Sequence, residues 1–318
     1  MRSPVPAVAR LLPLLAACAA DPAPAPTPGP PAAADPPQVV ALSLPAARLV
    51  EAIAPPGVAV TTLAPPGVDP PDHTPSVAEI AALQADADLI VAIGPDYERW
   101  VSTAALPRGR TLHLADAVTA PIELPGLRHS HGAGEAHSHA GRDPHVWSSP
   151  RAAREMVAAL APALAALPGV DAAAVTANEA RFAATAEALA AELQAVAGPL
   201  AGRPLASSHP AFGYLARDAG LTITAFGLDP LAAAGAEEAA AVQRWAAAAG
   251  PGAVLLWEEE PSAAARAALP AGVSHAYLDP LEGPAPGGAT DWAGAFRDNL
   301  DRLRALHPPA AGTAVPPG

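Results

Sequence analysis

The stretch DAAAVTANEARFAATAEALAAELQAVA, residues 171–197, decides the fold. Its larger apolar residues recur every three or four positions with few helix breakers, which predicts one long α-helix. On both sides of this helix, short apolar runs alternate with helical segments, a pattern typical of parallel sheets with crossover helices. We therefore predict an α/β protein with one half at residues 38–168, a helix at 169–198 and a second half at 199–307.

The alternation is regular enough to place the individual strands. Ser76 followed by Glu79 has the spacing of a helix-capping box, so a helix is expected to begin there. Helices are also expected at 46–53 and 150–167, and beginning near Pro210, Glu237, Pro261 and Asp291. The expected strands are 39–42, 58–63, 89–94, 205–207, 221–226, 253–257 and 273–278.

The composition excludes several classes of protein. The chain has 318 residues, a formal net charge of -13 and no lysine, so it lacks the basic surface that nucleic-acid binding requires. One cysteine cannot form an intrachain disulfide framework. No apolar stretch approaches the ~20 residues that span a bilayer.

The first residues predict export from the cytoplasm. Residues 1–17 combine arginines, a short apolar run and small residues in the order of a secretory signal peptide. Leu15-Ala16-Ala17-Cys18 resembles the bacterial lipoprotein motif, in which the cysteine is lipidated, although an ordinary cleaved signal remains the alternative. Residues 18–37 are rich in alanine and proline and predict an extended tether, and 308–318 predict a disordered tail. Either reading predicts an extracytoplasmic protein, in the periplasm or cell envelope.

Histidines are concentrated in one expected loop, at residues 128–141. His129, His131, His137 and His139 form two His-x-His pairs among glycines. Imidazole is a common ligand of borderline metals, so this loop is a candidate auxiliary metal-binding segment. The alternative is a solvated polar loop.

Three further residues stand where the expected strands or loops end. His145 closes the His-rich loop, and His209 and Asp279 each follow a predicted strand. Ligands gather at the carboxyl ends of strands in open α/β sheets, so these side chains are expected to converge. Two imidazoles and a carboxylate suit Zn²⁺ better than Ca²⁺ or Mg²⁺. Taken singly, each of these residues could instead cap a helix or begin a turn.

Seven motifs follow one another along the chain: LAPPGVDP (63–70), ADLIV (87–91), YERW (97–100), DPHVW (143–147), SHPAFGYL (208–215), WEEEP (257–261) and DPL (279–281). With these motifs the chain, from about Val39 to Leu306, resembles the zinc/manganese class of ABC-transporter substrate-binding lipoproteins. The resemblance implies two α/β lobes joined by one long rigid helix, with the metal bound in the cleft between the lobes by His145, His209 and Asp279. It also implies delivery to a membrane permease, attachment through a lipid anchor, and no catalysed reaction; we expect a monomer.

One position departs from the family pattern. The family places its first metal-ligating histidine directly after Asp-Pro or Asn-Pro, where this chain has Pro71. His73, two residues later, is the candidate replacement; otherwise water, Asp69, Asp72 or the His-rich loop would complete the shell. Manganese-type members often have glutamate at the position of His209, so zinc is expected and manganese is the alternative.

Two other functions share this site chemistry. A zinc hydrolase also has three protein ligands and a water, but the chain has no His-Glu-x-x-His motif and nothing singles out a general base among Glu258, Glu259 and Glu260. Glu260 is expected to form a salt bridge or a cap. A periplasmic zinc buffer without a transporter is the other alternative.

Overall fold

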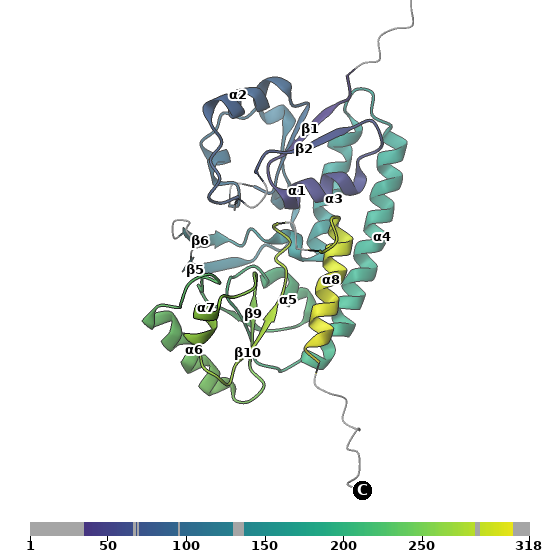
Figure 1. Ribbon diagram of the computed structural model, residues 1–318. Helices are drawn as coiled ribbons and strands as arrows, with labels where there is room; N and C mark the ends of the chain where they lie inside the picture. The colour runs from purple at the N-terminus through teal and green to yellow at the C-terminus, as the bar shows by residue number, and fades with distance from the viewer. Residues whose placement is uncertain are drawn as a thin grey trace, which may run out of the picture. The chain divides into compact units, whose positions relative to one another are not determined.

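The computed structural model describes residues 35–65, 68, 70–94, 96–129, 137–283 and 287–307, with backbone only for 125–129 and 137–140. The described residues from Pro36 to His307 belong to one compact unit. In the view of Figure 1 the two sheets lie one above the other, and one long helix, α4 (Ala172–Ala197), runs beside both. The prediction of an α/β fold with two parallel sheets and one long helix is confirmed.

The first lobe contains a four-stranded parallel sheet in the order β2-β1-β3-β4. Its apolar strands alternate between two cores: Val39 packs with α1, whereas Ile90 packs with α2. This alternation follows from the period of two along a strand. The elements are β1 (Gln38–Ala41), α1 (Leu44–Ile53), β2 (Ala59–Thr62), α2 (Val77–Asp86), β3 (Leu89–Ala92) and β4 (Thr111–His113).

The second lobe repeats this architecture with a parallel sheet in the order β10-β9-β7-β8. In β9, Leu256 joins the central core and Leu255 joins the core beneath α6 and α7. The elements are β7 (Leu205–Ser207), α5 (Gly213–Ala219), β8 (Ile223–Ala225), α6 (Ala236–Ala249), β9 (Val254–Trp257), α7 (Ala263–Ala267), β10 (Ser274–Tyr277) and α8 (Trp292–Ala305).

Helices α3 (Pro150–Ala165) and α4 (Ala172–Ala197) connect the lobes (Figure 1). Asp171 caps α4 by accepting hydrogen bonds from Ala173 N and Ala174 N, so the helix begins at 172 rather than 169. One continuous buried core includes residues of both sheets together with Phe182 and Leu193 of α4. The lobes are therefore joined by shared side-chain packing as well as by the chain itself.

The expected His-rich loop differs from prediction. Much of it is an antiparallel hairpin of β5 (Glu123–His129) and β6 (His137–Arg142), with a register shift between Pro125 and Arg128. The strands were not predicted because neither segment has the regular apolar alternation that indicates a strand.

One helix start agrees with its predicted cap, and one strand was not predicted. Ser76 and Glu79 form the expected capping box, while the short strand β4 was not predicted.

Within the part of the chain that the structure describes, no helix is long and apolar enough to cross a membrane. Short 3-10 turns occupy Arg99–Ser102, Arg108–Arg110, Leu114–Ala117, Val146–Ser148 and Gly198–Leu200.

Candidate metal centre

His145 is held in one orientation by the carboxylate of Asp143. Asp143 Oδ1 accepts a hydrogen bond from His145 N at 2.9 Å and lies 2.7 Å from His145 Nδ1. Both side chains are almost fully buried. A carboxylate on one ring nitrogen fixes the tautomer and leaves Nε2 for a metal, which is a common arrangement behind metal-ligating histidines.

His209 follows β7, in the second lobe, and its ring is also buried. Its Nδ1 lies 3.6 Å from Oε2 of Glu258, at the carboxyl end of β9. This places a buried carboxyl group behind the ring, on the side opposite the Nε2 atom that approaches His145.

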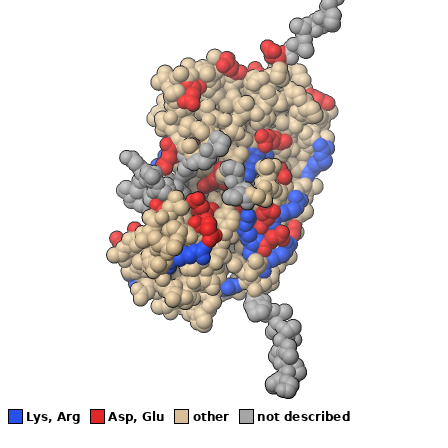
Figure 2. All heavy atoms as spheres, viewed as in Figure 1, with Lys and Arg blue, Asp and Glu red and all other residues tan. Residues whose placement is uncertain are grey.

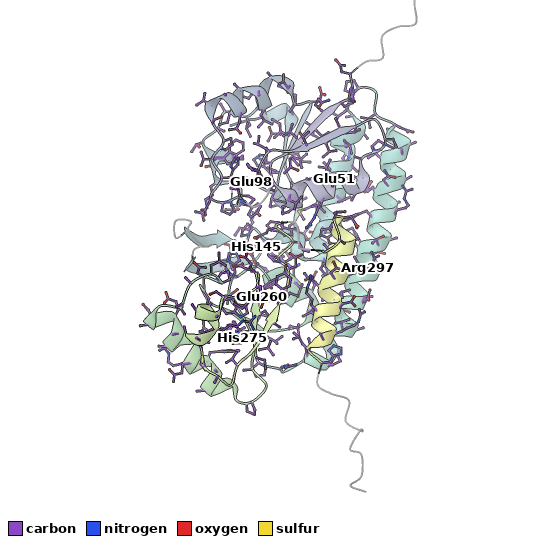
Figure 3. All side chains as sticks on the ribbon, viewed as in Figure 1. Glu51, Glu98, His145, Glu260, His275 and Arg297 are labelled. Atoms are coloured by element: carbon purple, nitrogen blue, oxygen red, sulfur yellow. The ribbon has the colours of Figure 1, made fainter. Side chains whose placement is uncertain are left out.

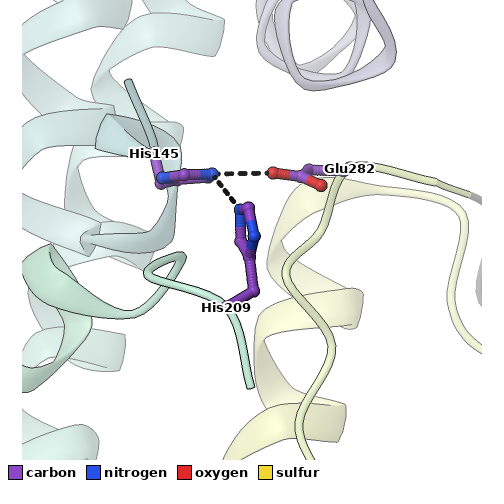
Figure 4. Close-up of side chains that lie close together, drawn as sticks. All are labelled: His145, His209 and Glu282. Atoms are coloured by element: carbon purple, nitrogen blue, oxygen red, sulfur yellow. Dashed lines mark hydrogen bonds and ion pairs between the residues drawn. The ribbon is translucent and has the colours of Figure 1, made fainter. Parts of the chain in front are cut away.

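Glu282 completes a group of three potential ligands (Figure 4). His145 Nε2 lies 3.2 Å from His209 Nε2 and 3.0 Å from Glu282 Oε1. Zinc with ligand bonds of 2.0–2.1 Å in a tetrahedron would separate its ligand atoms by about 3.3 Å. The donor types and their spacing therefore fit a zinc ion.

The two carboxylates change the protonation of His145. Burial opposes the charged imidazolium, but Asp143 and Glu282 outweigh it and raise the pKa of His145 to about 10. Without a metal, the ring is accordingly a cation held between two anions. A metal ion at this position replaces the proton.

The predicted ligand Asp279 lies in the same turn as Glu282 but outside this group of three. Its Oδ1 accepts a hydrogen bond from Leu281 N at 2.8 Å, while its Oδ2 is buried without a hydrogen-bond partner. Desolvation raises the pKa of Asp279. Its role as a ligand stays a prediction.

Glu282 was missed because Asp279 satisfied the expectation of a carboxylate after the last strand. The available signal was a second carboxylate in the same turn, three residues further on.

His73 also lies outside the group of three. Its Nε2 is buried without a hydrogen-bond partner, and its ring interacts electrostatically with Glu79 at the start of α2. Its role stays a prediction. The side chains of His129, His131, His137 and His139, and all of Cys18, lie outside what the structure describes.

Aromatic rings surround His145. The Trp147 and Tyr97 ring centroids lie 5.4 Å and 6.5 Å from that of His145, and both rings are buried. In the view of Figure 3, His145 lies between Glu98 of the first lobe and Glu260 of the second. Glu260 forms an ion pair with Arg266, which agrees with the expected structural role. This enclosure lowers the local dielectric and strengthens electrostatic contacts at the site.

On the face drawn in Figure 2, acidic side chains gather around the hollow between the lobes, and arginines gather over the long helices. Glu259 and Glu260, which follow β9, are exposed, whereas Glu258 is buried behind His209. Exposed acidic side chains favour the approach of cations.

Two buried histidines and a partly buried glutamate, set between two parallel-sheet lobes, define a class of metal-binding protein. Residues 39–306 match the family described as "Zinc-uptake complex component A periplasmic", and the chain belongs to this family. Members of this family are binding proteins rather than enzymes. The sequence-based resemblance is thereby confirmed.

Individual relatives agree with this assignment. Zinc-binding protein AdcA of Streptococcus pyogenes serotype M6 is 29% identical over 268 residues, covering 78% of this chain and 52% of the relative. The chain thus spans about half the length of the curated relatives it matches. The Zn(II)-bound ZnuA-like domain of Streptococcus pneumoniae AdcA is 26% identical, with a TM-score of 0.68 over 86% of this chain and 99% of that domain.

A Mn²⁺ complex of the binding protein FpvC from Pseudomonas aeruginosa shares the fold. Its TM-score is 0.68 at 21% identity, covering 85% of this chain and 98% of that one.

Proposed function

We propose that this protein captures zinc outside the cytoplasm with His145, His209 and Glu282 and delivers it to an ABC importer. The observation that carries the proposal is the approach of three potential ligand atoms, from two buried histidines and a partly buried glutamate on different segments, to within 4.8 Å of one another. The proposal is further supported by the zinc-binding name of the streptococcal relative.

Zinc is proposed over manganese because of the donor set. Two imidazole nitrogens and one carboxylate suit a borderline ion, whereas manganese prefers a larger share of oxygen ligands. A fourth position remains for water or for His73, which we retain as a candidate ligand. His129, His131, His137 and His139 are proposed to gather zinc before it reaches the buried site.

The binding test uses zinc titration with elemental analysis. We expect one tight site in the wild type and its loss in His209→Ala. His113→Ala is the matched control, since His113 is a partly exposed histidine at the end of β4. A wild type without a tight zinc site, or an unaffected His209→Ala, would contradict the proposal. His73→Ala decides whether His73 contributes.

A second comparison tests which carboxylate of the turn after β10, Asp279 or Glu282, binds zinc. Glu282→Gln should weaken zinc binding as a lost ligand does. Asp279→Asn tests the sequence-based assignment, and an equal loss of zinc in both variants would restore Asp279 as a ligand. Manganese titration of the same proteins measures the selectivity directly.

Delivery and anchoring belong to the proposal as well. Residues 1–17 would act as the signal peptide and Cys18 as the lipidated residue; the lipoprotein name of a structural relative from Bacillus subtilis supports this. Cys18→Ala should release the protein from the membrane fraction. Zinc-dependent co-purification with a permease distinguishes an importer component from a periplasmic zinc buffer.

A further inference from the structure

Glu282 lies in a turn whose backbone is strained. Leu281 has φ of 65°, and it is the only non-glycine residue with positive φ within the described ranges. This left-handed conformation is unfavourable for a leucine and persists only where surrounding contacts fix it. Leu281 is also buried, so the turn cannot relax outward without exposing an apolar side chain.

The contacts that fix this turn come largely from outside the second lobe. Arg48, in α1 of the first lobe, donates to Leu281 O at 3.1 Å and to Gly283 O at 3.3 Å, on either side of Glu282. Its Nε donates to Thr290 O at 3.0 Å. Trp147 Nε1 donates to Pro280 O at 2.8 Å.

Arg48 is suited to this task because a guanidinium has five donors in a rigid planar fork. The side chain is only 3% exposed, and the carbonyls that it contacts are part-buried or buried. A lysine ammonium is a compact point charge and cannot present the same spread of donors. An apolar side chain such as methionine would leave the three carbonyls without these donors.

We propose that Arg48 is a positioning residue that holds the Glu282 turn from the opposite lobe and thereby controls how tightly the site retains zinc. The inference rests on the proposed function for its zinc-binding part. Arg48 does not touch the metal site; it acts through the backbone on both sides of the ligand. Groups that support metal ligands in this way commonly change affinity by about 10- to 100-fold.

The test compares Arg48→Met and Arg48→Lys with Arg110→Met in the full mature chain. Arg110 is the matched control, because its guanidinium donates to the carbonyls of Ala87 and Gln84 within the first lobe. Zinc affinity is measured by competition with a chromophoric chelator, and zinc release by chelator trapping. We expect Arg48→Met to lose about 10- to 100-fold in affinity through faster release, and Arg110→Met to retain wild-type values.

A double-mutant comparison shows whether Arg48 acts through Glu282. Arg48→Met should cost little further affinity in a Glu282→Gln background, because the positioned carboxylate is already lost. An equal loss in both backgrounds, or wild-type affinity in Arg48→Met, would overturn the proposal. If Arg48→Met does not fold, Arg48→Lys gives the same decision, since it is expected to restore the fold but not the affinity.

Hydrogen exchange of the metal-free protein separates this inference from the proposed function. Exchange across 278–283 should rise in Arg48→Met and stay at wild-type levels in Arg110→Met. Unchanged exchange would refute the positioning role whether or not zinc binds. If the wild type exchanges slowly across 278–283 but has no tight zinc site, only the proposed function is refuted.

Discussion

Zinc binding should release a proton from His145 even at a pH well above the usual pKa of histidine. The Asp143 and Glu282 carboxylates raise the pKa of His145 to about 10, so the ring is protonated at pH 8 in the metal-free protein. Zinc needs the neutral ring, and binding at pH 8 should therefore displace about one proton. A histidine with its ordinary pKa of about 6.5 would release almost none at that pH.

Titration calorimetry in buffers of different ionisation enthalpy measures this number directly. The slope of the observed enthalpy against the ionisation enthalpy should correspond to about one proton at pH 8, and the apparent affinity should fall about tenfold for each unit below pH 8. A slope of zero at pH 8 would refute the reasoning about His145.

Asp143→Asn is the control for the origin of this proton. Removing one of the two carboxylates lowers the pKa of His145, so proton release at pH 8 should decrease. A proton lost from zinc-bound water instead would persist in this variant. A raised folded-state pKa also stabilises the metal-free protein below about pH 6.5, and this contribution disappears as the pH rises toward 10. The metal-free melting temperature of Asp143→Asn should therefore depend less on pH in this window.

Three other predictions concern the scaffold and the hairpin. Leu193→Ala, in the continuous core, should lower the free energy of unfolding by about 2–5 kcal/mol. Urea unfolding followed by fluorescence and circular dichroism should show one transition for both lobes. Separate transitions would contradict a shared core. Ser76→Ala should cost about 1 kcal/mol in thermal unfolding while leaving zinc affinity unchanged. Deleting residues 128–141 should slow zinc loading at low zinc in stopped-flow measurements and leave one tight site; loss of that site would count against His145, His209 and Glu282.

The fold was predictable because its signals are local. The buried strand Leu89–Ala92 is a continuous apolar run, and the caps at Ser76 and Asp171 depend on side chains within three residues. The hairpin was less predictable, since its two strands lack the regular apolar alternation that usually marks a strand in a sequence.

The site was predictable in part for the same reason. His145 and His209 follow recognisable motifs at element ends, which is where parallel sheets present ligands. The approach of Glu282 to the two histidines depends on the path of one turn. That path depends on the positive φ of Leu281 and on contacts from residues more than a hundred positions away.

The sequence by itself therefore determined two α/β halves, a long helix between them and two histidines at element ends. Only the tertiary structure decided which carboxylate approaches them and how it is held. The physical reason is that helices, strands and caps are specified by neighbours along the chain. The position of Glu282 depends instead on hydrogen-bond donors from the first lobe, above all Arg48. Arg48 is so far from Glu282 in the sequence that no local pattern connects them.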